Sequence, residues 1–398
     1  MKIDIPAGAV AAMEKLDSYI KENTIVVYSP GRINVIGEHT DYNEGFVLPA
    51  AIDKAAYIAI TPREDDEIHL YGVDMNGYHR TTVSTMKPVE DESWPNYMLG
   101  VVDQFVRSGI QVPGFDAALT GDIPIGAGLS SSAAVECAMA MGLNQIADAG
   151  FDRLTLTRMA QLAEHTYAGV QCGIMDQFAS MFGKKGYVIR LDCRSLAYEY
   201  VPFNLEGMSV VLLDTNVKHS LASTEYNTRR EQCEHGVALV KKHHPKVESL
   251  RDVRQEWLDQ YVKDEDPLAY RRCRFVLAEN QRLLDACAAL EKQDIGTLGK
   301  LMYAAHDGLS REYEVSCPEL DFLVDFVRQY PAIKGARMMG GGFGGCTINI
   351  IEENAVESVI GAATEAYNAK MGRKLTAYVA NTDTGTTIIQ QGMNTIRG

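Results

Sequence analysis

Short runs of β-branched and aromatic residues punctuate the first half of the chain. They predict strands at residues 24–28, 56–60, 117–120 and 187–191, and Pro30–Gly31 is expected to close the first strand. Between these runs, apolar residues recur at helical spacing in two segments. One segment contains Val135, Ala138, Met139, Leu143 and Ile146, and the other contains Leu156, Met159, Ala160, Ala163 and Tyr167.

The second half opens with a strongly apolar strand at residues 209–214. Residues 225–329 are then expected to be mainly helical, and strands return at residues 346–351 and 377–380. Strands and helices do not alternate regularly, which favours an α+β fold over a doubly wound sheet. We place a domain boundary near residue 205, which gives domains of residues 1–205 and 206–398.

Composition narrows the possible functions. The chain has 398 residues, 46% of them hydrophobic and 23% charged, which is typical of a soluble protein of two or three domains. The net charge of -15 argues against a nucleic-acid or acidic-membrane surface, and any phosphate must be held by local devices such as helix N-termini. The eight cysteines form no C-x-x-C pair, and we find neither a secretory signal nor a membrane-spanning run. We therefore expect a cytoplasmic protein with reduced cysteines, and a monomer.

A glycine-rich segment runs from Pro124 to Ala134, between a predicted strand and a predicted helix. Its glycines allow a sharp turn and a close backbone approach, and its three serines stand where the helix begins, so the segment forms a candidate anion site. A simple capped helix start is the alternative. Neither a Walker motif nor a protein-kinase signature is present. The segment resembles the phosphate loop of the GHMP kinases. This resemblance implies ATP binding by Gly126, Ala127, Gly128, Leu129, Ser130, Ser131 and Ser132.

A polar motif at residues 31–43 places Glu38, His39 and Asp41 within four positions. Such convergent hydrogen-bonding groups suit a sugar, although a polar turn with an internally satisfied histidine is the alternative. A metal site is less favoured because no second histidine stands at ligand spacing. Through Pro49 the run resembles the galactokinase signature. The resemblance implies that these three side chains bind galactose hydroxyls and that Arg32 sits beside the reacting hydroxyl.

Two further acidic residues become candidates through the same resemblance. Asp176 follows Gly173 in an apolar segment, where an aspartate usually caps a helix or pairs with a cation. In galactokinases the matching aspartate lies near O1, so Asp176 is expected to accept or orient the O1 proton beside Arg32, with Gly173 contacting the sugar. Glu164 would ordinarily be a solvated charge. The resemblance makes it a candidate Mg²⁺ ligand together with Ser132.

Three more segments match galactokinases. Residues 216–221 and Tyr226 match a segment that opens the second domain, where the tyrosine contacts the sugar; a core aromatic is the alternative. Trp94 matches a tryptophan that packs on adenine, or else fills a core. The glycine-rich segment 339–346 requires a tight turn or a close backbone approach, and the family places it near the phosphate loop.

Together these resemblances cover nearly the whole chain. They imply the two-domain GHMP kinase fold, with an N-terminal ribosomal-protein-S5-like domain, a C-terminal ferredoxin-like domain and the active site between them. The implied reaction is the ATP- and Mg²⁺-dependent phosphorylation of α-D-galactose at O1, the first committed step of galactose catabolism (the Leloir pathway). Two alternatives stay open: a kinase for N-acetylgalactosamine or L-arabinose, and a non-catalytic galactose and ATP sensor. The uninterrupted run from Ser130 to Ala134 speaks against the sensor.

Overall fold

The computed structural model describes residues 9–124, 126–217 and 222–391. Its largest sheet has the strand order β13-β1-β3-β6-β4-β5. Its strands, in chain order, are β1 (Ile25–Asn34), β3 (Pro49–Pro62), β4 (Glu67–Gly72), β5 (Gly77–Thr82), β6 (Phe115–Gly121) and β13 (Thr387–Gln391). Neighbours pair antiparallel except β4 and β6, which are parallel.

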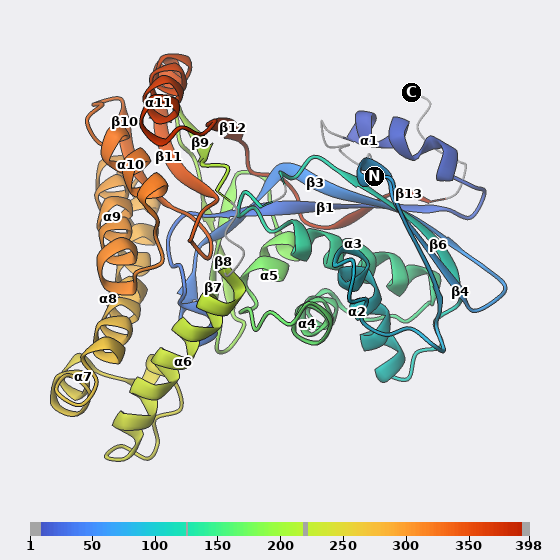
Figure 1. Ribbon diagram of the computed structural model, residues 1–398, viewed down its shortest axis with the longest axis horizontal. Coiled ribbons are helices and arrows are strands. Elements are labelled where there is room, and N and C mark those ends of the chain that lie inside the picture. The colour runs from blue at the N-terminus through green and yellow to red at the C-terminus, as the bar shows by residue number, and fades with distance from the viewer. Residues whose placement is uncertain (1–8, 125, 218–221, 392–398) are drawn as a thin grey trace.

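Helices cover both faces of this sheet (Figure 1). The short helix α1 (Ala9–Leu16) packs on one face, where it shares a small apolar cluster with Tyr28 and Tyr57. The other face carries the large apolar core, which lies between the strands of the sheet and the helices that cover them. The helices on that side are α2 (Trp94–Arg107), α3 (Ser131–Ile146), α4 (Arg153–Ala163) and α5 (Met175–Phe182).

A second sheet of four strands has the order β10-β11-β9-β12. Its strands are β9 (Met208–Asp214), β10 (Ile333–Met338), β11 (Cys346–Glu352) and β12 (Thr376–Ala380). The helices of this half are α6 (Ala222–Lys241), α7 (Gln255–Tyr261), α8 (Pro267–Glu291), α9 (Ile295–Gly308), α10 (Pro318–Val327) and α11 (Val356–Met371). A small third sheet joins β2 (Phe46–Val47), β7 (Tyr187–Asp192) and β8 (Tyr198–Pro202). In the described part of the chain, no helix is long and apolar enough to cross a membrane.

The α+β class and the strands and helices predicted from the sequence are present, but one local expectation and one alternative are wrong. Pro30–Gly31 does not close the first strand: β1 continues to Asn34, with a register shift between Pro30 and Arg32. The irregularity lets Gly31 pass the phosphate loop, because a Cβ at this position would lie only 2.6 Å from the Leu129 carbonyl oxygen. Glu164 is not solvated either, since the chain turns into a π-helical segment (Glu164–Ala168) that buries it.

Candidate active site

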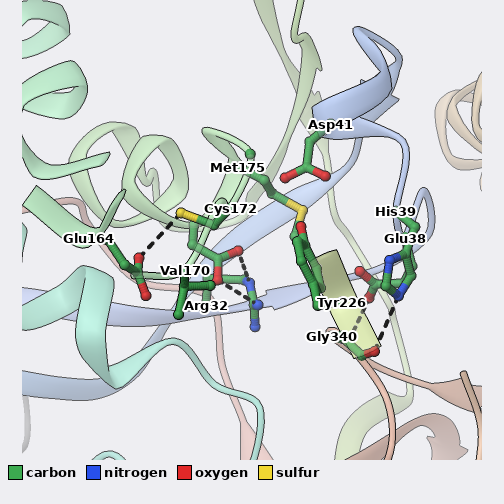
Figure 2. Close-up of a pocket in the computed structure, with 13 residues that line it drawn as sticks. Arg32, Glu38, His39, Asp41, Glu164, Val170, Cys172, Met175, Tyr226 and Gly340 are labelled. Atoms are coloured by element: carbon green, nitrogen blue, oxygen red, sulfur yellow. Dashed lines mark hydrogen bonds and ion pairs between the residues drawn. The ribbon is translucent and has the colours of Figure 1, made fainter. Parts of the chain in front are cut away.

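A cavity of about 140 Å³ lies where the two halves of the chain meet. Figure 2 shows Glu164 at one end and Glu38 and His39 at the other, with Arg32 and Tyr226 between them. Every residue predicted to act in catalysis or to contact the sugar lines this cavity, although they come from segments far apart in the sequence. These residues are Arg32, Glu38, His39, Asp41, Gly173, Asp176 and Tyr226.

An arginine–aspartate pair forms the wall of this cavity. Arg32 donates from Nε to Asp176 Oδ1 and from Nη2 to Asp176 Oδ2, both at 2.9 Å. Ser130 Oγ donates a further hydrogen bond to Asp176 Oδ2. Burial lowers the pKa of Arg32, but the carboxylates of Asp176 and Glu38 outweigh it and leave that pKa raised. The site therefore holds a fixed cation and a fixed carboxylate side by side.

Asp41 lies against Gly173, and no residue larger than glycine fits at position 173. A Cβ on Gly173 would stand 1.9 Å from Asp41 Oδ2, which is far inside van der Waals contact. Burial, followed by the nearby charge of Asp176, raises the pKa of Asp41 to about 7. Asp41 is therefore a carboxyl group whose charge is sensitive to what enters the cavity.

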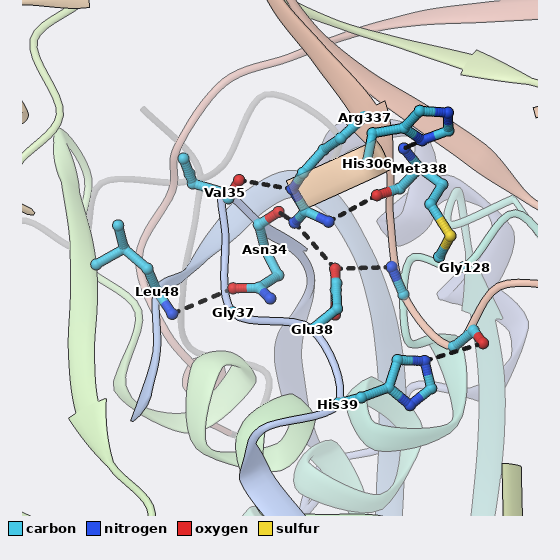
Figure 3. A network of polar contacts seen from close by, with 12 residues as sticks. Asn34, Val35, Gly37, Glu38, His39, Leu48, Gly128, His306, Arg337 and Met338 are labelled. Carbon is cyan, nitrogen blue, oxygen red and sulfur yellow. Dashed lines mark hydrogen bonds and ion pairs between the residues drawn. The ribbon is translucent and has the colours of Figure 1, made fainter. Parts of the chain in front are cut away.

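Glu38 is oriented by the second half of the protein (Figure 3). Its Oε1 accepts from Arg337 Nη2 at 3.0 Å and from the Gly340 amide at 2.8 Å. The Arg337 side chain is fully buried on β10 and also donates to the carbonyls of Asn34 and Val35. The role of Arg337 is not visible in the sequence, because the carboxylate that reveals it is 299 residues away.

The expected metal ligands lie next to each other. Ser132 Oγ donates to Glu164 Oε1 at 3.1 Å, and Gln177 Nε2 donates to Glu164 Oε2 at 2.7 Å. Gln177 also donates to the buried carboxylate of Glu136 at 3.0 Å. Burial and the charge of Asp176 raise the pKa of Glu164 to about 7. Neither Gln177 nor Glu136 was predicted from the sequence, where both look like ordinary helix residues.

A second cavity of about 590 Å³ lies on the other side of the Ser132–Glu164 pair. Trp94 and Tyr97 line it together with Gly126, Ser131 and Ser132, so the tryptophan faces the same space as the start of α3. This arrangement gives a flat aromatic surface for a base and a helix N-terminus for an anion.

The phosphate loop has the turns that the sequence predicted. Gly126 and Gly128 take left-handed φ values of 82° and 75°, and Ser130 does so at 59° before α3 begins. Ala127 and Leu129 point into the core, so they can meet a ligand only through their backbone. Ile125, like residues 218–221 of the matched segment 216–221, lies outside the described residues.

The third glycine-rich segment lies against the phosphate loop, as expected. A Cβ on Gly345 would stand 3.2 Å from the Ala127 carbonyl oxygen. Gly340 is also in contact with this loop, with the Gly128 carbonyl oxygen 3.5 Å from the place where its Cβ would be, and its left-handed φ of 79° favours glycine. The glycines therefore allow two backbone segments from opposite halves to touch.

Comparison with known proteins fits this geometry. Family models match residues 96–184 (GHMP kinases N terminal domain), 286–369 (GHMP kinases C terminal) and 17–62 (galactokinase galactose-binding signature). A galactokinase of Thermosipho africanus is 39% identical over 364 residues, covering 92% of this chain and 99% of the relative. The chain belongs to the galactokinases of the GHMP kinase family. A galactokinase of Thermotoga maritima is 41% identical over 346 residues, covering 87% of this chain and 95% of that protein.

Solved structures of GHMP kinases have the same architecture. Lactococcus lactis galactokinase complexed with galactose superimposes with a TM-score of 0.90 at 32% identity, covering 95% of this chain and 99% of that one. A mevalonate kinase superimposes with a TM-score of 0.63 at 17% identity, covering 90% of this chain and 99% of its own. The second match reflects the fold alone. The two-domain GHMP kinase fold of this chain is therefore clear from both sequence and structure.

Proposed function

We propose that this galactokinase transfers the γ-phosphoryl group of ATP to O1 of α-D-galactose, with Asp176 and Arg32 at the reacting oxygen. The activity of the family is the phosphorylation of galactose, and its phosphate donor is ATP. The observation that carries the assignment of residues is the paired Arg32–Asp176 contact inside the small cavity. A related protein has been solved in complex with galactose, which supports the same ligand here.

The small cavity is the proposed galactose site. Glu38 and Asp41 supply carboxylate oxygens that accept hydrogen bonds from sugar hydroxyls, and Tyr226 closes one wall. Gly173 leaves room for the Asp41 carboxylate, and His39 forms another part of the cavity wall. Buried acceptors of this kind discriminate strongly against a sugar that lacks the matching hydroxyl, because the acceptor is then left unpaired.

The larger cavity is the proposed ATP site. Its shape supports adenine against Trp94 and the phosphates at Gly126, Ser131 and the α3 N-terminus. The backbone of Ala127, Gly128, Leu129 and Ser130 completes the turn. The Ser132–Glu164 pair separates this cavity from the sugar site, so a terminal phosphate beside Ser132 would approach O1.

Ser132 and Glu164 are the proposed Mg²⁺ ligands. A hydroxyl and a carboxylate are hard oxygen donors, and Mg²⁺ commonly takes one or two carboxylates while phosphates and waters complete its shell. When bound, the ion would neutralise phosphate charge that this acidic chain cannot offset.

In the proposed reaction, Asp176 accepts a hydrogen bond from the O1 hydroxyl. This bond orients a lone pair of O1 towards the γ-phosphorus. Arg32 lies beside the same oxygen and stabilises negative charge as the O1–P bond forms and the bond from the γ-phosphorus to the bridging oxygen breaks, which releases ADP. The proton passes to Asp176 or to the transferred phosphoryl group. A loose transition state makes positioning and charge stabilisation the main contributions of the protein.

The test is an assay of galactose 1-phosphate formation from galactose, ATP and Mg²⁺, followed by ³¹P NMR. Asp176→Asn keeps the side-chain shape but removes the charge, and we expect kcat to fall by about 10²–10⁴-fold. Circular dichroism and the melting temperature check that the variant is folded. Near-normal turnover by folded Asp176→Asn protein would remove Asp176 from the mechanism, and an inactive wild type would remove the proposed function.

Selectivity and organisation need separate experiments. A panel of galactose, N-acetylgalactosamine and L-arabinose, ranked by kcat/KM, tests whether galactose is the preferred sugar. We retain the division into residues 1–205 and 206–398 as a proposal, with β13 returning from the second part to pair with β1, along with a cytoplasmic location and a monomer. Light scattering after gel filtration measures the oligomeric state directly.

A further inference from the structure

A chain of hydrogen bonds runs from the wall of the sugar cavity into the helical half of the protein. The His39 ring bonds at both nitrogens, with Nε2 3.2 Å from the Gly341 carbonyl oxygen and Nδ1 2.8 Å from the Tyr42 hydroxyl. The Tyr42 and Tyr313 hydroxyls are 2.8 Å apart, and the Tyr313 hydroxyl is 3.3 Å from Cys233 Sγ. His39 lines the cavity, whereas Tyr42 and Tyr313 stand behind it.

The Gly341 carbonyl oxygen determines which group donates in each hydrogen bond of this chain. A carbonyl oxygen only accepts, so His39 Nε2 must carry the hydrogen that faces Gly341. Burial lowers the pKa of His39 to about 3, with Arg229 and Arg337 acting in the same direction, so the ring is neutral and has one N–H. Nδ1 is then an acceptor, and the Tyr42 hydroxyl must donate to it.

The remaining hydrogens follow in order. With its own hydrogen committed to His39, the Tyr42 oxygen accepts from the Tyr313 hydroxyl. The Tyr313 oxygen in turn accepts from the Cys233 thiol. Ring packing holds this geometry, because the centroids of His39 and Tyr313 are 4.9 Å apart and those of Tyr42 and Tyr226 are 5.1 Å apart. The chain has one consistent arrangement of donors and acceptors.

We propose that Tyr42, aligned by Tyr313, is a positioning residue that, together with the Gly341 carbonyl, holds the His39 ring as the Nε2–H tautomer and so fastens the sugar motif to the Gly340–Gly341 turn. This inference deepens the proposed function and rests on it. Because both ring nitrogens are engaged within the protein, His39 shapes the cavity and holds its far wall. The same turn donates the Gly340 amide to Glu38 at 2.8 Å, so the bond from His39 to Gly341 helps to orient a carboxylate that reads the sugar.

Tyr42→Phe and Tyr313→Phe test the proposal, because each removes one hydroxyl and keeps the ring. Tyr28→Phe is the matched control: Tyr28 is fully buried, and its hydroxyl donates to Asp383 at 3.0 Å on the α1 side of the large sheet. Protein labelled with ¹⁵N-histidine shows the tautomer of each ring in two-bond ¹H–¹⁵N spectra. His39→Gln protein identifies the His39 signals among the nine histidines.

We expect wild-type His39 to show the Nε2–H pattern. In Tyr42→Phe the Nδ1 chemical shift should change, because Nδ1 then has no donor, while the Gly341 carbonyl still accepts from Nε2. The KM for galactose should rise about fivefold or more in Tyr42→Phe, since a buried polar atom is left unsatisfied. It should rise less in Tyr313→Phe, and the KM for ATP should change less than twofold in both. Tyr28→Phe should keep the wild-type His39 pattern and both KM values, whatever its melting temperature.

An Nδ1–H or doubly protonated His39 in the wild type would overturn the assignment of the tautomer. A KM for galactose in Tyr42→Phe equal to that of Tyr28→Phe would overturn the positioning role and leave the chain a purely structural feature. The spectra require no turnover. If the wild type forms no galactose 1-phosphate, the proposed function fails while the tautomer is still measured on its own terms.

Discussion

Replacing Gly173 with alanine adds one methyl group at the most crowded point of the sugar site. The new Cβ would lie 1.9 Å from Asp41 Oδ2, whereas ordinary contact begins at 3.4 Å, so the two atoms must separate by 3.4 − 1.9 = 1.5 Å. The backbone of Gly173 is not left-handed, so the contact itself is what excludes a side chain. Either Asp41 leaves its position or the segment that carries Asp176 moves.

A displacement of about 1 Å in an active site can reduce the rate by about 10²-fold. We therefore expect the kcat/KM for galactose of Gly173→Ala to fall by about 100-fold, which corresponds to about 2.7 kcal/mol of transition-state stabilisation. The assay measures initial rates over a range of galactose concentrations at saturating ATP. Gly361→Ala is the matched control, because a Cβ on Gly361 in α11 meets no atom within 4 Å.

A double substitution tests whether Asp41 causes the loss. If the clash with Asp41 is responsible, Gly173→Ala should have almost no further effect in an Asp41→Gly background. That change removes the carboxylate and also Asp41 Cβ, which would lie 2.7 Å from the new atom. A kcat/KM within about threefold of wild type for Gly173→Ala alone would refute the geometric argument. So would a full 100-fold loss that persists when Asp41 is already glycine.

Three further changes test other parts of the site. Trp94→Ala should raise the KM for ATP by an amount equivalent to about 1–3 kcal/mol of lost base stacking and leave the KM for galactose unchanged; an unaltered KM for ATP would place adenine elsewhere. Glu164→Gln should weaken Mn²⁺ binding in the presence of ATP, measured by electron paramagnetic resonance, about tenfold or more; unchanged binding would remove Glu164 as a ligand. The raised pKa of Asp41 favours its protonated form in the folded ligand-free protein, so its contribution to stability is present below pH 4 and is lost as pH rises towards 7. Urea unfolding of wild type and Asp41→Asn should therefore diverge in favour of the variant between pH 4 and 7, and parallel curves would contradict the shift.

Local features of the fold were predictable because they depend on nearby residues. The apolar spacing at Val135, Ala138 and Met139 is enough to predict α3, and the run at 209–214 matches β9 except that the strand begins one residue earlier, at Met208. The course of β1 was not predictable from its own residues. Pro30 and Gly31 normally end a strand, and only the close approach of Leu129 from another segment explains why this one continues.

The site itself is a set of long-range contacts. The resemblance identifies Arg32 and Asp176, but their pairing joins residues 144 positions apart, and no local pattern reveals it. Gln177 and Glu136 were missed for the same reason, since their importance lies in a shared contact behind Glu164. The burial of Glu164 depends on a π-helical turn that the helical spacing of α4 does not indicate.

The pairing of β13 with β1 has a consequence for how the protein is made. β1 leaves the ribosome early, but β13 follows only after the second sheet and α11 have been synthesised. Until then, one side of β1 is an open edge able to pair with a strand of another nascent chain. We expect the demand for chaperones to peak late in translation, and a chain halted before Thr387 to aggregate even though every residue of its active site has already been made.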